Sequence, residues 1–220
     1  MGDQKQPERA MDITSWLSLL AVCSLGAMSP GPSVAVIIQI SSRRGRQHGF
    51  VAAFAHGLGV GCYALMASLG LTLVITSDPF IFNGIKWVGA AFLLYLGCRA
   101  LGLKVNRKPN NESGTEVEIS PQNHSLPGSA RTAFLIAILN PKVALFFLAL
   151  FSQFVRNDAG TGEKLLMAAT ATGVDILWFV LVVLAVTTTS VVAKFSGYGK
   201  ILEKLFGVLI IAVALKVAVS

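Results

Sequence analysis

The sequence SPGP at residues 29–32 interrupts a long apolar stretch close to its centre, and NPK at residues 140–142 interrupts a second such stretch. Proline lacks a backbone N–H and its ring displaces the carbonyl one turn earlier, so each motif breaks a helix. The carbonyls freed in this way would be those of Gly26, Met28 and Ala137. Two breaks at matching places predict a transport site lined by exposed backbone, whereas single breaks usually serve packing alone.

The composition of the chain argues against a soluble domain. Its 220 residues are 54% hydrophobic and 13% charged, and the mean hydropathy is +0.67. A soluble domain carries about 25% charged residues. Here the charges gather in short runs between apolar blocks of about 20 residues, the length of a membrane-spanning helix. The net charge of +7 is therefore attributed to loops that face anionic lipid, and no nucleic-acid partner is expected.

Six apolar blocks predict an all-α integral membrane protein with six transmembrane helices. They cover residues 14–40, 50–76, 80–103, 130–155, 164–192 and 200–218. Polar residues form a tail at 1–13 and a flexible connector at 104–129. The connector separates a first three-helix repeat, 14–103, from a second one, 130–220. Because each half has an odd number of spans, we expect two inverted repeats, each beginning with a proline-broken helix.

The distribution of lysine and arginine predicts the orientation in the membrane. Eleven of these residues follow spans one, three and five, and six lie on the opposite side. Cytoplasmic loops carry the excess of positive charge. We therefore expect a multi-pass protein of the cytoplasmic (inner) membrane, with the connector 104–129 in the cytoplasm and both termini in the periplasm.

Two formal charges are placed near the membrane centre, Asp175 in the fifth span and Lys142 in the fourth. An ionised carboxylate at this depth costs roughly 2.5–3.5 kcal/mol on insertion scales, so Asp175 should be paired, protonated or functional. We expect the two side chains to face one cavity. There, Asp175 is either a proton carrier or the static partner of Lys142.

Other polar and aromatic side chains near the breaks are candidates for contact with a cargo. Hydrogen-bonding groups are offered by Ser29, Ser33, Gln39 and Asn140. Trp178 lies one helical turn after Asp175 on the same face, where it either walls a cargo pocket or fills the core. The glycine-rich run HGLGVG at 56–61 indicates close helix packing, because no strand precedes it as in a nucleotide site. His56 also offers hydrogen bonds at membrane depth. It is interpreted as a histidine with satisfied hydrogen bonds at a helix interface, and a role as a ligand is the alternative.

Several of these motifs together resemble one family. They are SPGP at 29–32, RRGRQHG at 43–49, HGLGVG at 56–61, KWVGAAFLLYLGCRAL at 86–101, LNPKVALFFLALFSQFV at 139–155 and GVDILWF at 173–179. Over residues 12–218 the chain resembles the LysE-type amino-acid exporters, which include homoserine and threonine exporters. The resemblance implies a small inner-membrane carrier that exports amino acids or close derivatives, uses the proton gradient, and needs no nucleotide or other cofactor. It is not expected to be an enzyme.

The resemblance carries the proline motifs, Lys142 and Asp175 over as site candidates. With the polar residues above, the predicted substrate-binding set is Ser29, Pro30, Gly31, Pro32, Ser33, Gln39, Asn140, Pro141, Lys142 and Trp178, and Asp175 is predicted to couple the proton. Two positions depart from the family pattern: Ser33 stands where many relatives have asparagine, and Ser152 where many have proline. The loss of an amide at Ser33 predicts a change in cargo selectivity.

A divalent-metal exporter of similar architecture is the alternative. Metal export favours clustered histidines and carboxylates, whereas this chain has one acid near the membrane centre and scattered histidines, so no metal site is predicted. One buried acid also favours a neutral cargo over a basic one. The expected partners are thus an amino acid, protons and membrane lipid. The glycines of the second span pack either within one chain or between two chains of a homodimer.

Overall fold

The computed structural model describes residues 11–29, 31–102, 125–156 and 159–188, together with eight positions between 204 and 215. Helices are the only regular secondary structure in these residues. They are α1 (Ile13–Met28), α2 (Pro32–Arg44), α3 (Arg46–Ser77), α4 (Pro79–Ala100), α5 (Leu126–Leu139), α6 (Pro141–Phe154) and α7 (Thr161–Thr188). Most of the expected polar tail, the connector and the sixth span lies outside the described residues.

Short polar side chains cap the first turns of α1, α4 and α5. The Asp12 carboxylate accepts a hydrogen bond from the backbone N–H of Thr14, 3.2 Å away, at the start of α1. Asp78 ends α3 and its Oδ1 accepts from the N–H groups of Phe80 and Ile81 at the start of α4. Ser125 caps α5 in the same way. Each cap satisfies backbone donors that have no partner within the helix.

Helix α5 begins four residues before the predicted start of the second repeat. Leu126, which the sequence pattern assigned to the connector 104–129, is already its first residue. The Ser125 hydroxyl accepts from Gly128 N at 3.2 Å, and Pro127 lies in the first turn, where its missing N–H costs nothing. The polar residues at this point therefore form the start of a helix and not part of a linker.

Three helices, α3, α4 and α7, are long and apolar enough to cross a membrane. The pairs α1–α2 and α5–α6 also pass this test when each is taken together, bent by 61° and 56°. The described residues therefore contain three to five candidate spans. Both proline motifs coincide with breaks, since α1 ends at Met28 before Pro32 opens α2, and α5 ends at Leu139 before Pro141 opens α6.

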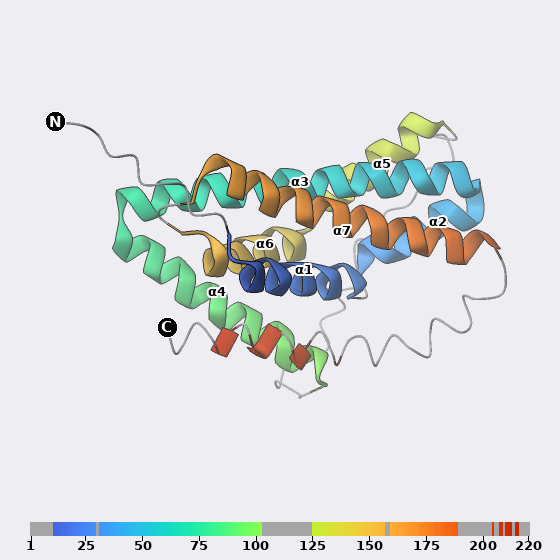
Figure 1. Ribbon diagram of the computed structural model, residues 1–220. Helices are drawn as coiled ribbons and strands as arrows, with labels where there is room; N and C mark the ends of the chain where they lie inside the picture. The colour runs from blue at the N-terminus through green and yellow to red at the C-terminus, as the bar shows by residue number, and fades with distance from the viewer. Residues whose placement is uncertain are drawn as a thin grey trace.

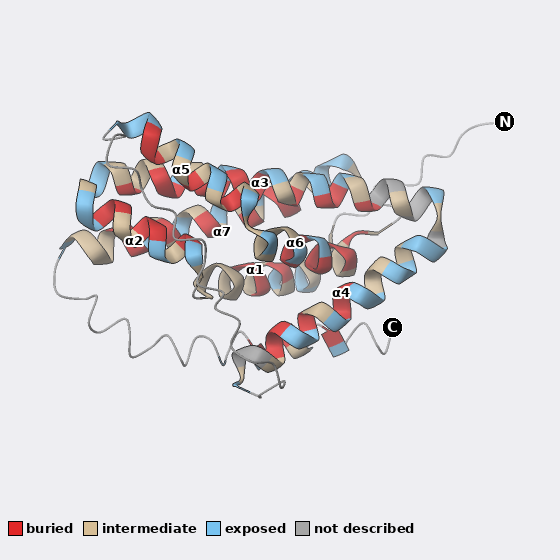
Figure 2. Cartoon of the chain, turned by 180° about the vertical axis from the view of Figure 1, so that it is seen from behind, coloured by how far each residue is buried: buried red, intermediate tan, exposed pale blue. Residues whose placement is uncertain are grey.

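The helices form an elongated bundle in which α3 packs against α7 and α5, and α1 packs against α7 (Figure 1). The pairs α1–α2 and α5–α6 run in opposite directions along it (Figure 1). Figure 2 shows buried residues on the sides of the helices that face one another and exposed residues along the outside of α4. Phe80 and Val88 of α4 are 87% and 71% exposed, as suits a surface in contact with lipid tails.

The glycines of the HGLGVG run bring α3 close to its neighbours. A Cβ added at Gly57 would lie 2.3 Å from Ile176 Cγ1, and one at Gly61 would lie 2.5 Å from Thr172 Oγ1, both on α7. One at Gly59 would lie 2.7 Å from Ala137 Cβ on α5. The predicted packing role is confirmed, and these contacts are made within one chain.

Candidate functional site

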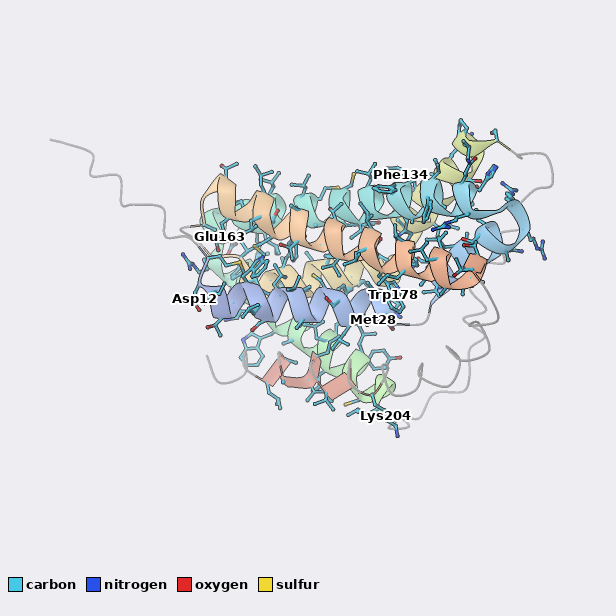
Figure 3. The ribbon with its side chains drawn as sticks, turned by 45° about the vertical axis from the view of Figure 1, so that its right-hand side comes forward. Asp12, Met28, Phe134, Glu163, Trp178 and Lys204 are labelled. Carbon is cyan, nitrogen blue, oxygen red and sulfur yellow. The ribbon has the colours of Figure 1, made fainter. Side chains whose placement is uncertain are left out.

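A cavity lies where the two helix breaks meet. Its walls come from both breaks and from the middle of α3 and α7. The polar residues that line it are Ser29, Ser33, His56, Asn140, Lys142 and Asp175, and the apolar ones include Val34, Val60, Val143, Phe146, Phe147 and Phe179. Figure 3 shows Met28, at the end of α1, and Trp178 of α7 away from Asp12 and Glu163, which mark one end of the bundle. The break before α2 therefore lies within the length of the bundle.

In the first break, the chain turns without a side-chain cap. The backbone N–H of Ser29 donates to the carbonyl of Gly26, 3.2 Å away, and closes α1. Gly31 precedes α2 in an extended conformation with φ −165°, and as a glycine it has no side chain to cap the first N–H groups of α2. Such donors carry partial positive charge, which attracts anions. Pro30 lies outside the described residues.

In the second break, one residue serves both helices. The backbone N–H of Asn140 donates to the carbonyl of Ala137, 3.4 Å away, and closes α5. Its side-chain oxygen accepts from the N–H of Lys142, 3.0 Å away, and caps α6. The prolines were expected to free the carbonyls of Gly26 and Ala137. In the structure each of these carbonyls accepts the N–H that closes its helix.

Lys142 joins the two breaks. Its Nζ donates to Ser29 Oγ over 3.1 Å, although the two residues are 113 positions apart in the chain. A Cβ added at Gly31 would lie 3.9 Å from the same Nζ. A positive charge is therefore held beside the first turn of α2, within the cavity.

Asp175 is paired with His56. Asp175 Oδ2 lies 2.7 Å from His56 Nδ1, and the two residues are 6% and 2% exposed. The ring of Phe179 packs edge-on against the imidazole, with the ring centroids 4.7 Å apart. Asp175 and Lys142 line one cavity, as expected, but the side chain that Asp175 contacts in the structure is His56 and not Lys142. The glycine contacts of α3 with α7 bring His56 to this position.

The structure brings most of the predicted residues together. Ser29, Gly31, Pro32, Ser33, Asn140, Lys142 and Asp175 line the cavity. Gln39, Pro141 and Trp178 are described but are not among its lining residues. Gln39 is seven residues beyond Pro32, about 10 Å along α2. Trp178 is half-buried and packs against a core cluster shared by α2, α3, α5 and α7. Of its two expected roles, it therefore fills the core.

Sequence reasoning left His56 out of the predicted site and missed the aromatic wall of the cavity. His56 was expected at a helix interface, where it lies, but its contact with Asp175 was not foreseen. Its position just before Gly57, on the face that meets α7, was the available signal. Phe146 and Phe147 pack edge-to-face, with centroids 5.3 Å apart, and an added Cβ at Gly26 would lie 2.8 Å from the Phe146 ring. In an apolar helix such residues carry no signal of their own.

No group of three or more histidine, cysteine, aspartate or glutamate side chains able to hold a metal ion occurs in the part of the chain that the structure describes. His56 and Asp175 form a pair, and a third such ligand is needed for a typical site. The polar groups of the cavity are instead a cation, a histidine–carboxylate pair, an amide and hydroxyls, a set suited to a small molecule with both charges.

Comparison with known proteins places these features in a wider group. A family model described as LysE type translocator matches residues 24–220. A membrane protein of Bacillus subtilis, named as uncharacterized, is 26% identical over 209 residues, which cover 92% of this chain and 99% of that protein. The leucine efflux protein of Salmonella typhimurium is 27% identical over 194 residues, 86% of this chain and 87% of that protein. No solved structure matches the chain.

Proposed function

The chain belongs to the LysE type translocator family, and from this premise we propose that it exports a neutral amino acid or a close derivative in exchange for protons. The family and the leucine efflux relative point to a membrane transporter and not to an enzyme. The finer elements of the proposal are the cargo, the proton coupling, the residues of the site and the topology.

The observation that carries the proposal is the arrangement of charge in the cavity. Lys142 and the uncapped first turn of α2 offer positive charge to a carboxylate. The His56–Asp175 pair offers negative charge to an ammonium group. Phe146, Phe147 and Phe179, with neighbouring valines, provide an apolar wall for a side chain. An amino acid presents these three chemical features together.

The same arrangement supports a neutral cargo. A basic side chain would need a carboxylate in addition to the one that receives the α-ammonium group. Asp175 is the only acidic residue that lines the cavity among the described residues. Glu163 is also buried on α7 but lies twelve residues earlier, about 18 Å along the helix. The similarity to a leucine efflux protein agrees with a neutral amino acid.

For the architecture, we propose six spans in two inverted three-helix repeats, with the connector in the cytoplasm and both termini in the periplasm. The opposite directions of α1–α2 and α5–α6 support the inversion (Figure 1). Alternating access would then rock one repeat against the other around the cavity. Accessibility of a tag after Ser220 on intact cells tests the orientation, and a tag that is reached only after permeabilisation contradicts it.

Reconstitution of the purified protein into liposomes tests the function. Labelled leucine, threonine, homoserine and lysine should be supplied singly, with and without an imposed pH gradient. We expect accumulation of at least one neutral amino acid only when the gradient is present, and none of lysine. Equal fluxes of every transported amino acid with and without the gradient would contradict the coupling, and no flux of any amino acid would contradict amino-acid export.

A further inference from the structure

We propose that Nε2 of His56 is the atom that accepts the exchanged proton, and that this proton and the cargo's ammonium group compete for the His56–Asp175 pair. This inference rests on the proposed export function. It assigns the proton to a residue of α3, whereas the family resemblance carried over only the proline motifs, Lys142 and Asp175 as site candidates. It also makes the pair a single exchange unit, whereas the sequence pointed to Asp175 alone.

The first support is an unsatisfied nitrogen. Nδ1 of His56 is 2.7 Å from Asp175 Oδ2, whereas Nε2 is buried and makes no hydrogen bond with any residue the structure describes. His56 is 2% exposed and lines the cavity. Buried polar atoms without a partner are uncommon in proteins and call for an explanation. A proton-binding or cargo-binding role supplies one.

The second support is the tautomer that the pair imposes. With Asp175 ionised, Nδ1 donates its hydrogen to Oδ2, and Nε2 then carries a lone pair. A proton that enters the cavity adds to this lone pair without breaking another bond. The pair changes from a net charge of −1, imidazole with carboxylate, to a net charge of zero, imidazolium with carboxylate.

This change of charge links the proton to the cargo. An ammonium group is attracted to the pair when its net charge is −1, and the attraction is lost when the net charge is zero. The cargo therefore binds from the side where protons are scarce and is released where they are abundant. One proton replaces one ammonium group, which is the exchange that export against a gradient requires.

The other groups around the pair are compatible with this role. From α6, Lys142 holds the positive charge of the cavity, and from α1, Cys23 contributes a thiol. From α7, Phe179 covers one side of the imidazole with an apolar ring. Among the described lining residues, Asp175 is thus the one acid that faces His56.

Exchange and gradient-driven transport must be compared to test this inference. His56→Asn keeps an N–H donor near Asp175 but has no titratable atom. His48→Asn is the matched control. His48 also lies on α3 and its Nδ1 is 2.9 Å from a hydroxyl oxygen, Ser129 Oγ, but it does not line the cavity. In liposomes with leucine, the ratio of pH-driven accumulation to leucine–leucine exchange should collapse in His56→Asn and stay at the wild-type value in His48→Asn. A structural role alone would lower both fluxes together, and an unchanged ratio would overturn the inference.

Leucine binding to the unmutated protein in detergent gives a second test that needs no variant to fold. Its apparent affinity should fall as the pH of the assay is lowered, by up to about tenfold per pH unit, the limit for one competing proton. A flat profile overturns the inference. If the unmutated protein neither binds nor moves any amino acid, the proposed function fails first, so the two failures are distinguishable.

Discussion

The two helix breaks reach similar bends by different chemistry. Between α5 and α6 one residue, Asn140, closes the first helix with its backbone and caps the second with its side chain. Between α1 and α2 three residues intervene, and Gly31 precedes α2 with no side-chain cap. The bends are nonetheless 56° and 61°. In each break a proline opens the second helix, and similar bends occur with and without a side-chain cap.

The difference shows where each break obtains its support. The α5–α6 break is held by hydrogen bonds within its own segment. The α1–α2 break has the backbone bond from Ser29 to Gly26, but its side-chain hydrogen bond comes from Lys142, in the other half of the chain. We therefore expect substitutions at the α5–α6 break to act on stability, and substitutions of the bridging lysine to act on transport.

Lys142→Met should have the largest effect, because it removes both the bridge between the breaks and the cation offered to the cargo. A hydrogen bond to a charged group contributes about 1.5–3 kcal/mol, which corresponds to a roughly 10- to 150-fold fall in apparent affinity for the cargo. Leucine binding and uptake into liposomes measure it. Lys164→Met, in the first turn of α7, is the control, and equal losses in both variants would contradict the assignment.

Gly26→Ala should follow, because it acts on the α1 side of the first break. The new Cβ would lie 2.8 Å from the Phe146 ring, which has to move within the cavity wall. Overpacking of this kind costs about 1–3 kcal/mol, and both thermal stability in detergent and leucine transport should fall. Gly84→Ala is the control, since nothing lies within 4 Å of its added Cβ. Matching melting temperatures for the two variants would show that the contact carries no energy.

Asn140→Ala should destabilise the protein by about 0.5–2 kcal/mol, the usual cost of a lost N-cap. Thermal unfolding in detergent measures this loss. Asn140→Asp, which keeps an acceptor for the Lys142 N–H, should recover most of it. Ser29→Ala is the counterpart in the first break and should cost less stability, because the Ser29 side chain caps no helix. A larger loss in Ser29→Ala would reverse the comparison between the breaks.

Gly31→Ala should have the smallest effect. Its φ of −165° is an extended conformation open to any residue, and an added Cβ would have its nearest neighbours 3.9 Å away. The melting temperature should be unchanged or slightly higher, since alanine restricts the unfolded chain by about 0.4–1 kcal/mol relative to glycine. A clear loss of stability would mean that the first break needs glycine for its backbone.

Much of the fold could be predicted because its signals are local. Apolar length predicts spanning helices, and proline breaks a helix through its own missing N–H, so both interruptions appear at SPGP and NPK. The start of α5 was misplaced because a polar first turn with Ser125 and Pro127 has the composition of a linker as well as of a helix start. Composition was equally uninformative in the site. Phe146 is one apolar residue among many in its helix, so nothing in the sequence marks it as part of the cavity wall.

The sequence by itself determined that the chain is helical, apolar enough for a membrane, and broken at two places, because helix propensity, hydropathy and proline act on neighbouring residues. Only the tertiary structure decided that Lys142 reaches Ser29 and that His56 takes Asp175 as its partner. These contacts join residues more than a hundred positions apart, and they depend on how closely the glycines of α3 let α7 approach. Packing of whole helices sets that distance, so no local pattern contains it.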